Sequence, residues 1–163
     1  IAQVARAMGG RLYCIDHWKG SENTLLVQMA EATNIYEMFE SNLTSAGLWE
    51  YITPMVTDSK TASELFTDGS IVFLFLDADH RYKHFKEDLD VWLPKMKNGG
   101  IICGHDCEGF YSKLSLEQKE QIDSRLGDDF TGVYHAGIIK GLFEKFSDDY
   151  SIVDNTRIWF KVV

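Results

Sequence analysis

The sequence has little of what membrane-spanning or nucleic-acid-binding proteins need. No apolar run reaches the roughly 18 residues of a membrane-spanning helix. The 16 Lys and Arg residues are outnumbered by 25 Asp and Glu residues, which gives a formal net charge of -9. The positive charges also do not cluster along the chain. Because nucleic acids and anionic membranes are bound by clustered positive charge, we expect neither as a partner.

Cysteine is also scarce. The chain has three cysteines, Cys14, Cys103 and Cys107, without the spacing of a metal finger. An odd number of cysteines suits a reducing compartment better than a disulfide framework, so we expect a cytoplasmic protein. A chain of 163 residues with 45% hydrophobic content is long enough to bury a sizeable core. We therefore expect a single ordered domain over residues 1–163.

Strand-like and helical patterns alternate along the chain. Residues 71–76 are apolar at every position, which predicts a central parallel strand covered on both faces. Pro54 lacks a ladder donor, so the strand-like run at 51–57 should lie at a sheet edge. The runs at 150–153 and 157–163 predict a closing hairpin. Together these patterns predict an α/β fold, with a sheet of mostly parallel strands and an antiparallel end.

Local signals predict where several helices begin and end. Asn34 with Glu37, and Ser115 with Gln118, have the spacing of capping boxes at helix starts. Pro94 should end or kink the helix before it, because proline lacks the amide hydrogen that helix interiors use.

Four successive strand-like runs end in or beside an aspartate. Taken singly, each aspartate has a simple explanation, because Asp is a good turn and helix-cap residue after a strand. In a parallel sheet, however, all strand carboxyl ends lie at one edge, where open α/β folds bind ligands. The occurrence at all four ends therefore favours a shared site. These residues are Asp16, Asp58, Asp77 and Asp106.

Asp16 has the setting of an acid that binds a ribose. Such an acid closes the second strand of a nucleotide-binding half, about 20 residues after a glycine-rich loop. Only fifteen residues precede Asp16, and Gly9 and Gly10 form the turn into its strand. We expect the native protein to have a first strand and glycine loop that are absent from this sequence. That strand would lie between the runs at 11–16 and 71–76, so these two runs should not pair directly.

Several segments resemble the class I S-adenosylmethionine-dependent methyltransferases. The resemblance is closest to the small bacterial O-methyltransferase branch related to macrocin, cephalosporin-cluster and caffeoyl-CoA methyltransferases. It implies a Rossmann-like sheet with helices on both faces, strand order 3-2-1-4-5-7-6 and a reversed last strand. The segments are "GRLYCIDHWKGSE", "IVFLFLDADHRYKHFKEDLDVWLPKMKNGGIICGHD", "HAGIIKGLFEKF" and "TRIWFKVV".

The resemblance also implies roles for individual residues. Asp16 would hold the cofactor ribose, with His17 and Trp18 lining the same pocket. Asp58 and Ser59 would lie by the adenine, and Asp77 would also line the cofactor site. Asp77 and Asp106 match positions where metal-dependent members hold a divalent cation. Those members usually have Asp or Asn directly after the second acid, whereas this chain has Cys107 there and His105 before it.

The expected chemistry is methyl transfer to a hydroxyl of a small molecule. In such a reaction the protein aligns the methyl donor with the acceptor and removes the proton of the acceptor hydroxyl. His80 is a candidate general base because histidine titrates near neutrality, with Asp77 beside it, and a helix-capping role for His80 is the alternative. His84 should lie at the surface, and His135 could be structural or could line the substrate pocket.

A divalent cation between Asp77 and Asp106, with His105 as a further ligand, would bind and acidify the acceptor hydroxyl. Oxygen ligands alone would favour Mg²⁺ or Ca²⁺, whereas a ligating His105 or Cys107 would favour Mn²⁺, Fe²⁺ or Zn²⁺. Asp79 should turn away from this site and cap the following helix. The alternative without a metal is that these acids bind the cofactor amine or cap a helix.

Two other functional classes stay open. Asp77-Ala78-Asp79 also resembles the Asp-x-Asp motif by which many glycosyltransferases bind a metal and a sugar nucleotide. A truncated domain that binds a partner without catalysis is the other alternative, because the glycine loop is missing. For an enzyme, the expected partners are a small-molecule acceptor and, as an open alternative, a second copy of the chain in a homodimer.

Overall fold

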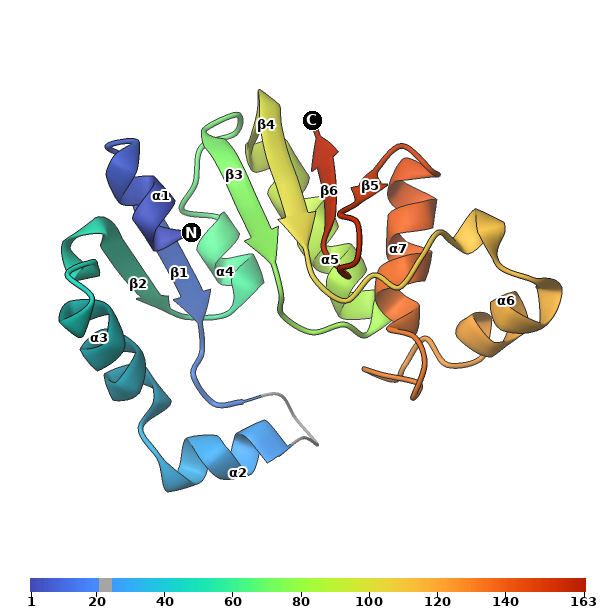
Figure 1. Ribbon diagram of the computed structural model, residues 1–163, viewed down its shortest axis with the longest axis horizontal. Helices are drawn as coiled ribbons and strands as arrows, with labels where there is room; N and C mark the ends of the chain where they lie inside the picture. The colour runs from blue at the N-terminus through green and yellow to red at the C-terminus, as the bar shows by residue number, and fades with distance from the viewer. Residues whose placement is uncertain (21–24) are drawn as a thin grey trace. The chain divides into compact units, whose positions relative to one another are not determined.

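The chain forms two compact units, residues 1–62 and 63–163, in the computed structural model, which describes residues 1–20 and 25–163 (Figure 1). No helix within these described ranges has the length and apolar character needed to cross a bilayer. The single domain expected over residues 1–163 stays a prediction.

The first unit is built on two parallel strands, β1 (Leu12–Asp16) and β2 (Ile52–Val56). Their register pairs Leu12 with Ile52 and Asp16 with Val56, so both strands end at the same edge. Within the described residues β2 pairs with β1 alone, which confirms the edge position expected from Pro54. The other elements are α1 (Ala2–Ala7), α2 (Leu25–Ala32), α3 (Ile35–Ser45), the 3-10 helix η1 (Trp49–Tyr51) and α4 (Ser59–Ser63), which reaches the unit boundary.

The second unit contains a four-stranded sheet in the order β3-β4-β6-β5. β3 and β4 run parallel, and β6 is antiparallel to both β4 and β5, which confirms the predicted closing hairpin. The last strand, β6, lies between β4 and β5. This agrees with the expected order, in which strand 7 lies between strands 5 and 6. No ladder among the described residues joins β1 to β3, as predicted. The strands are β3 (Ile71–Leu76), β4 (Met96–Gly104), β5 (Ser151–Ile152) and β6 (Trp159–Val162).

The core of the second unit lies between its sheet and the helices α5 (Tyr82–Trp92) and α7 (Ala136–Phe146) (Figure 1). Trp159 on β6 is fully buried and meets the ring of Phe85 on α5, with the centroids 5.9 Å apart. A side chain at Gly104 would place Cβ 2.3 Å from the Leu76 oxygen, so this strand end requires glycine. The remaining elements are η2 (Leu93–Lys95), η3 (Tyr111–Lys113) and α6 (Leu116–Asp123).

The predicted helix boundaries at Asn34, Ser115 and Pro94 are confirmed. The Asn34 side chain accepts a hydrogen bond from the Glu37 amide at 3.1 Å. Ser115 and Gln118 form a complete capping box at the start of α6. α5 ends at Trp92, and Pro94 lies in the 3-10 turn that follows.

The expectation that residues 71–76 are covered on both faces is wrong for part of β3. Val72 is 63% exposed and Phe73 is 42% exposed. These neighbours point to opposite faces, and β3 is the edge strand of its sheet in the second unit. An edge strand has a neighbour on one side only, so an apolar sequence alone does not ensure its burial.

Candidate active site

In the first unit, Asp16 closes β1 and shapes the turn that follows. Its Oδ1 atom accepts a hydrogen bond from the Trp18 amide at 2.6 Å. Trp18 has a φ of +60°, which directs the chain away from the strand. His17 is exposed, and its Nδ1 accepts a hydrogen bond from the Lys19 amide at 3.0 Å. The sequence-predicted cofactor residues Asp16, His17 and Trp18 are therefore adjacent in one tight turn.

Trp18 packs into an aromatic cluster supplied mainly by α3. Its ring centroid lies 5.5 Å from that of Tyr36 and 4.8 Å from that of Phe39. Phe39 in turn contacts Trp49, with the centroids 5.9 Å apart. Among the residues that the structure describes, the buried Trp18 Nε1 atom has no hydrogen-bond partner. The cluster fixes the position of the Trp18 ring.

Asp58 follows β2 and caps α4. Its carboxylate accepts hydrogen bonds from the Thr61 amide at 2.9 Å and the Thr61 hydroxyl at 2.7 Å. These bonds lower the pKa of Asp58. Ser59 is the first residue of α4. The cap explains Asp58 without a ligand, although the parallel register places Asp58 and Asp16 at the same strand edge.

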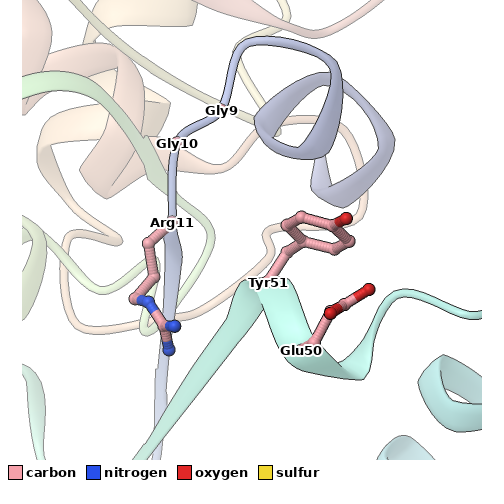
Figure 2. Close-up of a pocket in the computed structure, with 5 residues that line it drawn as sticks. All are labelled: Gly9, Gly10, Arg11, Glu50 and Tyr51. Carbon is pink, nitrogen blue, oxygen red and sulfur yellow. The ribbon is translucent and has the colours of Figure 1, made fainter.

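The pocket drawn in Figure 2 lies at the other end of these strands. Gly9, Gly10 and Arg11 precede β1, and Glu50 and Tyr51 precede β2 (Figure 2). This hollow is therefore at the amino ends of the strands, away from Asp16 and Asp58. It contains none of the residues predicted to bind a cofactor.

In the second unit, His80 lies among three carboxylates beyond the ends of β3 and β4. Its Nε2 is 3.5 Å from Asp77 Oδ1, while its Nδ1 is 3.7 Å from Asp106 Oδ2 and 3.5 Å from Asp129 Oδ1. The His80 side chain is 13% exposed, whereas that of Asp77 is 51% exposed. Three of the sequence-predicted site residues, Asp77, His80 and Asp106, are thus brought together.

The surroundings of His80 raise its pKa. Burial alone lowers the pKa of this imidazole, but the polar contact with Asp77 and the negative charges of Asp129, Asp106 and Asp77 outweigh that effect. The same contact with His80 lowers the pKa of Asp77. His80 therefore retains its proton to a higher pH than a solvent-exposed histidine does.

Asp106 is held in an unusual backbone conformation. Its φ is +61°, in the left-handed region that residues other than glycine seldom adopt. Its Oδ1 lies 3.0 Å from His105 Nδ1 and 3.2 Å from Arg157 Nη2, yet this buried oxygen makes no well-aligned hydrogen bond with any residue that the structure describes. Strain and an unpaired buried oxygen at one residue are typical of a functional site.

His135 is the last member of the cluster. The sequence analysis left its role open between a structural one and lining the substrate pocket. Its Nε2 is 3.6 Å from Asp106 Oδ2, and its ring centroid lies 5.0 Å from that of His80. Glu108, which the sequence did not single out, lies 2.7 Å from His135 Nδ1 through Oε1. The approach of His135 to His80 depends on Gly137, where an added Cβ would lie 2.1 Å from the His80 oxygen. A glycine there lets the start of α7 approach the His80 backbone.

Two sets of residues in this cluster have the composition of a metal site. His80, Asp106 and His135 form one set, and Asp77, His105 and Asp106 form the other. In each set the three donor atoms lie within 4.8 Å of one another. The predicted metal ligands Asp77, His105 and Asp106 are therefore adjacent in space.

Residues 1–107, well over half of the chain, match a family model described as "Methyltransferase domain". The chain belongs to this methyltransferase-domain family. The match confirms the resemblance seen in the sequence. A comparison with curated proteins found no match.

Solved structures share the fold of this methyltransferase domain at low identity. A Corynebacterium glutamicum protein superposes with a TM-score of 0.53 and 11% identity over 94% of this chain and 60% of its own. A cofactor-bound protein from MTB gives a TM-score of 0.52 and 13% identity over 99% of this chain and 66% of its own. An O-methyltransferase family protein from Burkholderia thailandensis gives a TM-score of 0.54 and 12% identity over 98% of this chain and 45% of its own. The domain thus spans between 45% and 66% of the length of these proteins.

Asp79 does not join the cluster of the methyltransferase domain. Its carboxylate accepts hydrogen bonds from Arg81 Nε at 2.9 and 3.0 Å and from the Arg81 amide at 2.9 Å. It therefore turns away from Asp77 toward the start of α5, where Arg81 is the N-cap residue. The Asp-x-Asp pattern does not present two converging carboxylates here.

Cys107 stands where the sequence comparison led us to expect Asp or Asn, and its surroundings do not suit a metal ligand. It is fully buried, and its Sγ lies 3.4 Å from the Gly109 oxygen, to which it donates a hydrogen bond. Burial raises the pKa of this thiol to about 12. The thiolate that a metal would require is therefore strongly disfavoured near neutral pH.

Proposed function

We propose that the protein transfers a methyl group from S-adenosylmethionine to a hydroxyl group of a small molecule. The observation that carries this proposal is the position of His80 between Asp77 and Asp106 in a chain of the methyltransferase-domain family. A histidine beyond the carboxyl ends of parallel strands lies where open α/β folds bind their ligands.

The transfer is an in-line displacement at the methyl carbon. The bond between this carbon and the sulfonium sulfur breaks as the bond to the acceptor oxygen forms, and S-adenosylhomocysteine leaves. His80 takes the hydroxyl proton, for which its neutral imidazole is required. The nearby Asp77 and Asp106 carboxylates stabilise the imidazolium that results. Positioning of donor and acceptor supplies the rest of the acceleration.

The cofactor would be held by the residues at the strand edge of the first unit. Asp16 is our candidate for the ribose hydroxyls, with His17 and Trp18 beside it. Asp58 and Ser59 are the candidates near the adenine. Support comes from the position of Asp16 and Asp58 at the carboxyl ends of the paired parallel strands β1 and β2. Asp77 stays a predicted cofactor contact.

The Asp77, His105 and Asp106 set is a candidate site for a divalent cation, because the three donor atoms lie within 4.8 Å of one another. The Arg157 guanidinium, 3.2 Å from Asp106 Oδ1, opposes a positive charge on that side of the carboxylate. When bound, such a cation would lower the pKa of the acceptor hydroxyl. The mixed oxygen and nitrogen donors suit Mn²⁺ as well as Mg²⁺ or Ca²⁺.

The proposal is tested by supplying full-length protein with S-adenosylmethionine and a panel of small hydroxylated acceptors, and measuring S-adenosylhomocysteine. The expected result is product formation that His80→Gln lowers by roughly 10²- to 10⁴-fold, the usual contribution of a general base. His84→Gln is the matched control, because His84 lies on the exposed face of the adjoining helix α5. Turnover that survives His80→Gln would contradict the base assignment.

A further inference from the structure

Asp106 presents its two carboxylate oxygens to two different groups of residues. Oδ1 faces His105 Nδ1 at 3.0 Å and Arg157 Nη2 at 3.2 Å. Oδ2 faces the imidazoles of His80 and His135, at 3.7 Å from Nδ1 and 3.6 Å from Nε2. The guanidinium charge of Arg157 opposes a cation on the Oδ1 side. The Oδ2 side is lined by two nitrogen donors that are neutral once deprotonated.

The spacing on the Oδ2 side suits a small tetrahedral ion. Metal–ligand distances of about 2.1 Å with tetrahedral angles separate neighbouring donor atoms by about 3.4 Å. The two distances to Asp106 Oδ2, 3.6 and 3.7 Å, are close to this value. A regular octahedral ion would instead require separations of about 3.0 Å between neighbouring donors at this bond length.

His135 already has the outer partner that a metal-binding histidine needs. Glu108 Oε1 lies 2.7 Å from His135 Nδ1, and Glu108 Oε2 accepts the His135 amide hydrogen at 3.0 Å. A proton on Nδ1 that is shared with this carboxylate leaves the lone pair of Nε2 directed at Asp106. This carboxylate–histidine pairing fixes the tautomer and orientation of metal-ligating histidines.

His80 can present its other nitrogen in the same way. Its Nε2 faces Asp77 Oδ1 at 3.5 Å, so a proton on Nε2 is next to a carboxylate. The lone pair is then on Nδ1, which lies 3.7 Å from Asp106 Oδ2 and 3.5 Å from Asp129 Oδ1. The side chains of His80, Asp106 and His135 are 9% to 13% exposed, so the three donors are largely shielded from water.

We propose that His80 Nδ1, Asp106 Oδ2 and His135 Nε2 form a binding site for a tetrahedral transition-metal ion of the Zn²⁺ or Co²⁺ class. Three protein ligands leave the fourth position to water or to a substrate oxygen. The ligand set differs from Asp77, His105 and Asp106, and the inference does not rest on methyl transfer. A metal at this site occupies the Nδ1 lone pair of His80, so metal binding and proton acceptance at that atom exclude each other.

The test is direct metal binding to the full-length protein after exhaustive chelation. Co²⁺ is added and the intense visible absorption of tetrahedral Co²⁺ is recorded, with Zn²⁺ then displacing it in a calorimeter. We expect a one-to-one complex that His135→Ala and His80→Gln each weaken by roughly a hundredfold or more. Glu108→Gln should weaken it by about tenfold to a hundredfold, as loss of an outer partner does.

His105→Ala is the matched control, because His105 belongs only to the other donor set. It should leave the Co²⁺ spectrum unchanged and the affinity within about twofold, whereas Asp106→Asn should weaken binding. Asparagine also tolerates the positive φ of Asp106. Asp77→Asn removes the carboxylate beside His80 Nε2, so it should weaken binding by about tenfold, as loss of an outer partner does. Circular dichroism confirms that each variant is folded.

The proposal is overturned if the chelated protein gives no tetrahedral Co²⁺ spectrum, or if folded His135→Ala and His80→Gln variants both bind as tightly as the parent. Loss of binding in His105→Ala, with retention in His135→Ala, would assign the metal to the other donor set. Because the readout is a spectrum and a binding heat, failure of methyl transfer would not alter either result.

Discussion

The Glu108 carboxylate contacts His135 at two points: Oε1 lies 2.7 Å from the ring Nδ1, and Oε2 accepts a hydrogen bond from the backbone amide at 3.0 Å. His135 is the N-cap residue of α7, so this one carboxylate holds both a helix start and the ring that faces Asp106. Arg157 Nη1 lies 3.4 Å from the same carboxylate. The start of α7 and the loop after β4 are thereby tied together.

Glu108→Gln is expected to lower the free energy of unfolding by about 1–3 kcal/mol, because it leaves buried donors with a weaker acceptor. Denaturant unfolding at neutral pH measures the change. Glu87→Gln, at an exposed position on α5, is the control and should change stability by less than about 0.5 kcal/mol. Equal stability of the two variants would mean that Glu108 does not hold α7.

Gly137→Ala should destabilise the second unit and separate His80 from His135. The added Cβ would lie 2.1 Å from the His80 oxygen and 2.3 Å from the Tyr82 nitrogen, so backbone must shift. Overpacking of this kind typically costs about 1–3 kcal/mol. Gly109→Ala is the matched control, because no atom lies within 4 Å of its added Cβ. Thermal unfolding should distinguish the two, and a parent-like melting temperature for Gly137→Ala would contradict the packing described.

The pH titration of His80 should have a midpoint above 6.5, the ordinary value for histidine. Its charged form gains contacts on folding, so this stabilisation is full below pH 6.5 and is lost as the pH rises through the raised pKa. NMR of the imidazole protons measures the midpoint without any substrate. Asp77→Asn removes one of the interactions that raise the pKa, so it should move the midpoint down. A midpoint below 6.5 in the parent would refute the electrostatic account.

Cys107→Asp should not restore the acid found at this position in metal-dependent members. The site is fully buried, and a carboxylate there would be an unpaired buried charge. We expect a loss of about 3–5 kcal/mol in the free energy of unfolding. Cys107→Ala is the control, because it removes the thiol without adding charge and should cost less. A Cys107→Asp variant as stable as Cys107→Ala would show that this position can face solvent or a cation.

The sequence predicted those features that depend on local pattern or on strand periodicity. The cap at Ser115 involves residues three apart, and the pairing of β3 with β4 follows from two apolar runs. The convergence of Asp77, His80 and Asp106 was predictable in part, because parallel strands end at one edge.

The sequence could not predict contacts between distant loops. Glu108 and His135 are 27 residues apart, and Arg157 approaches Glu108 from the far end of the chain. Nothing in the spacing of these residues relates them, because tertiary packing alone decides which loops meet. The left-handed conformation of Asp106 was equally hidden, since aspartate usually adopts negative φ.

Binding of S-adenosylmethionine tests the central claim most directly. Full-length protein is titrated in a calorimeter with S-adenosylmethionine and, separately, with a uridine-diphosphate sugar plus Mn²⁺. We predict that S-adenosylmethionine binds, that the sugar nucleotide gives no heat, and that Asp16→Ala weakens cofactor binding roughly tenfold or more. Asp154→Ala is the control and should not weaken binding, because Asp154 is exposed in the turn between β5 and β6. Binding of the sugar nucleotide without binding of S-adenosylmethionine would contradict the account.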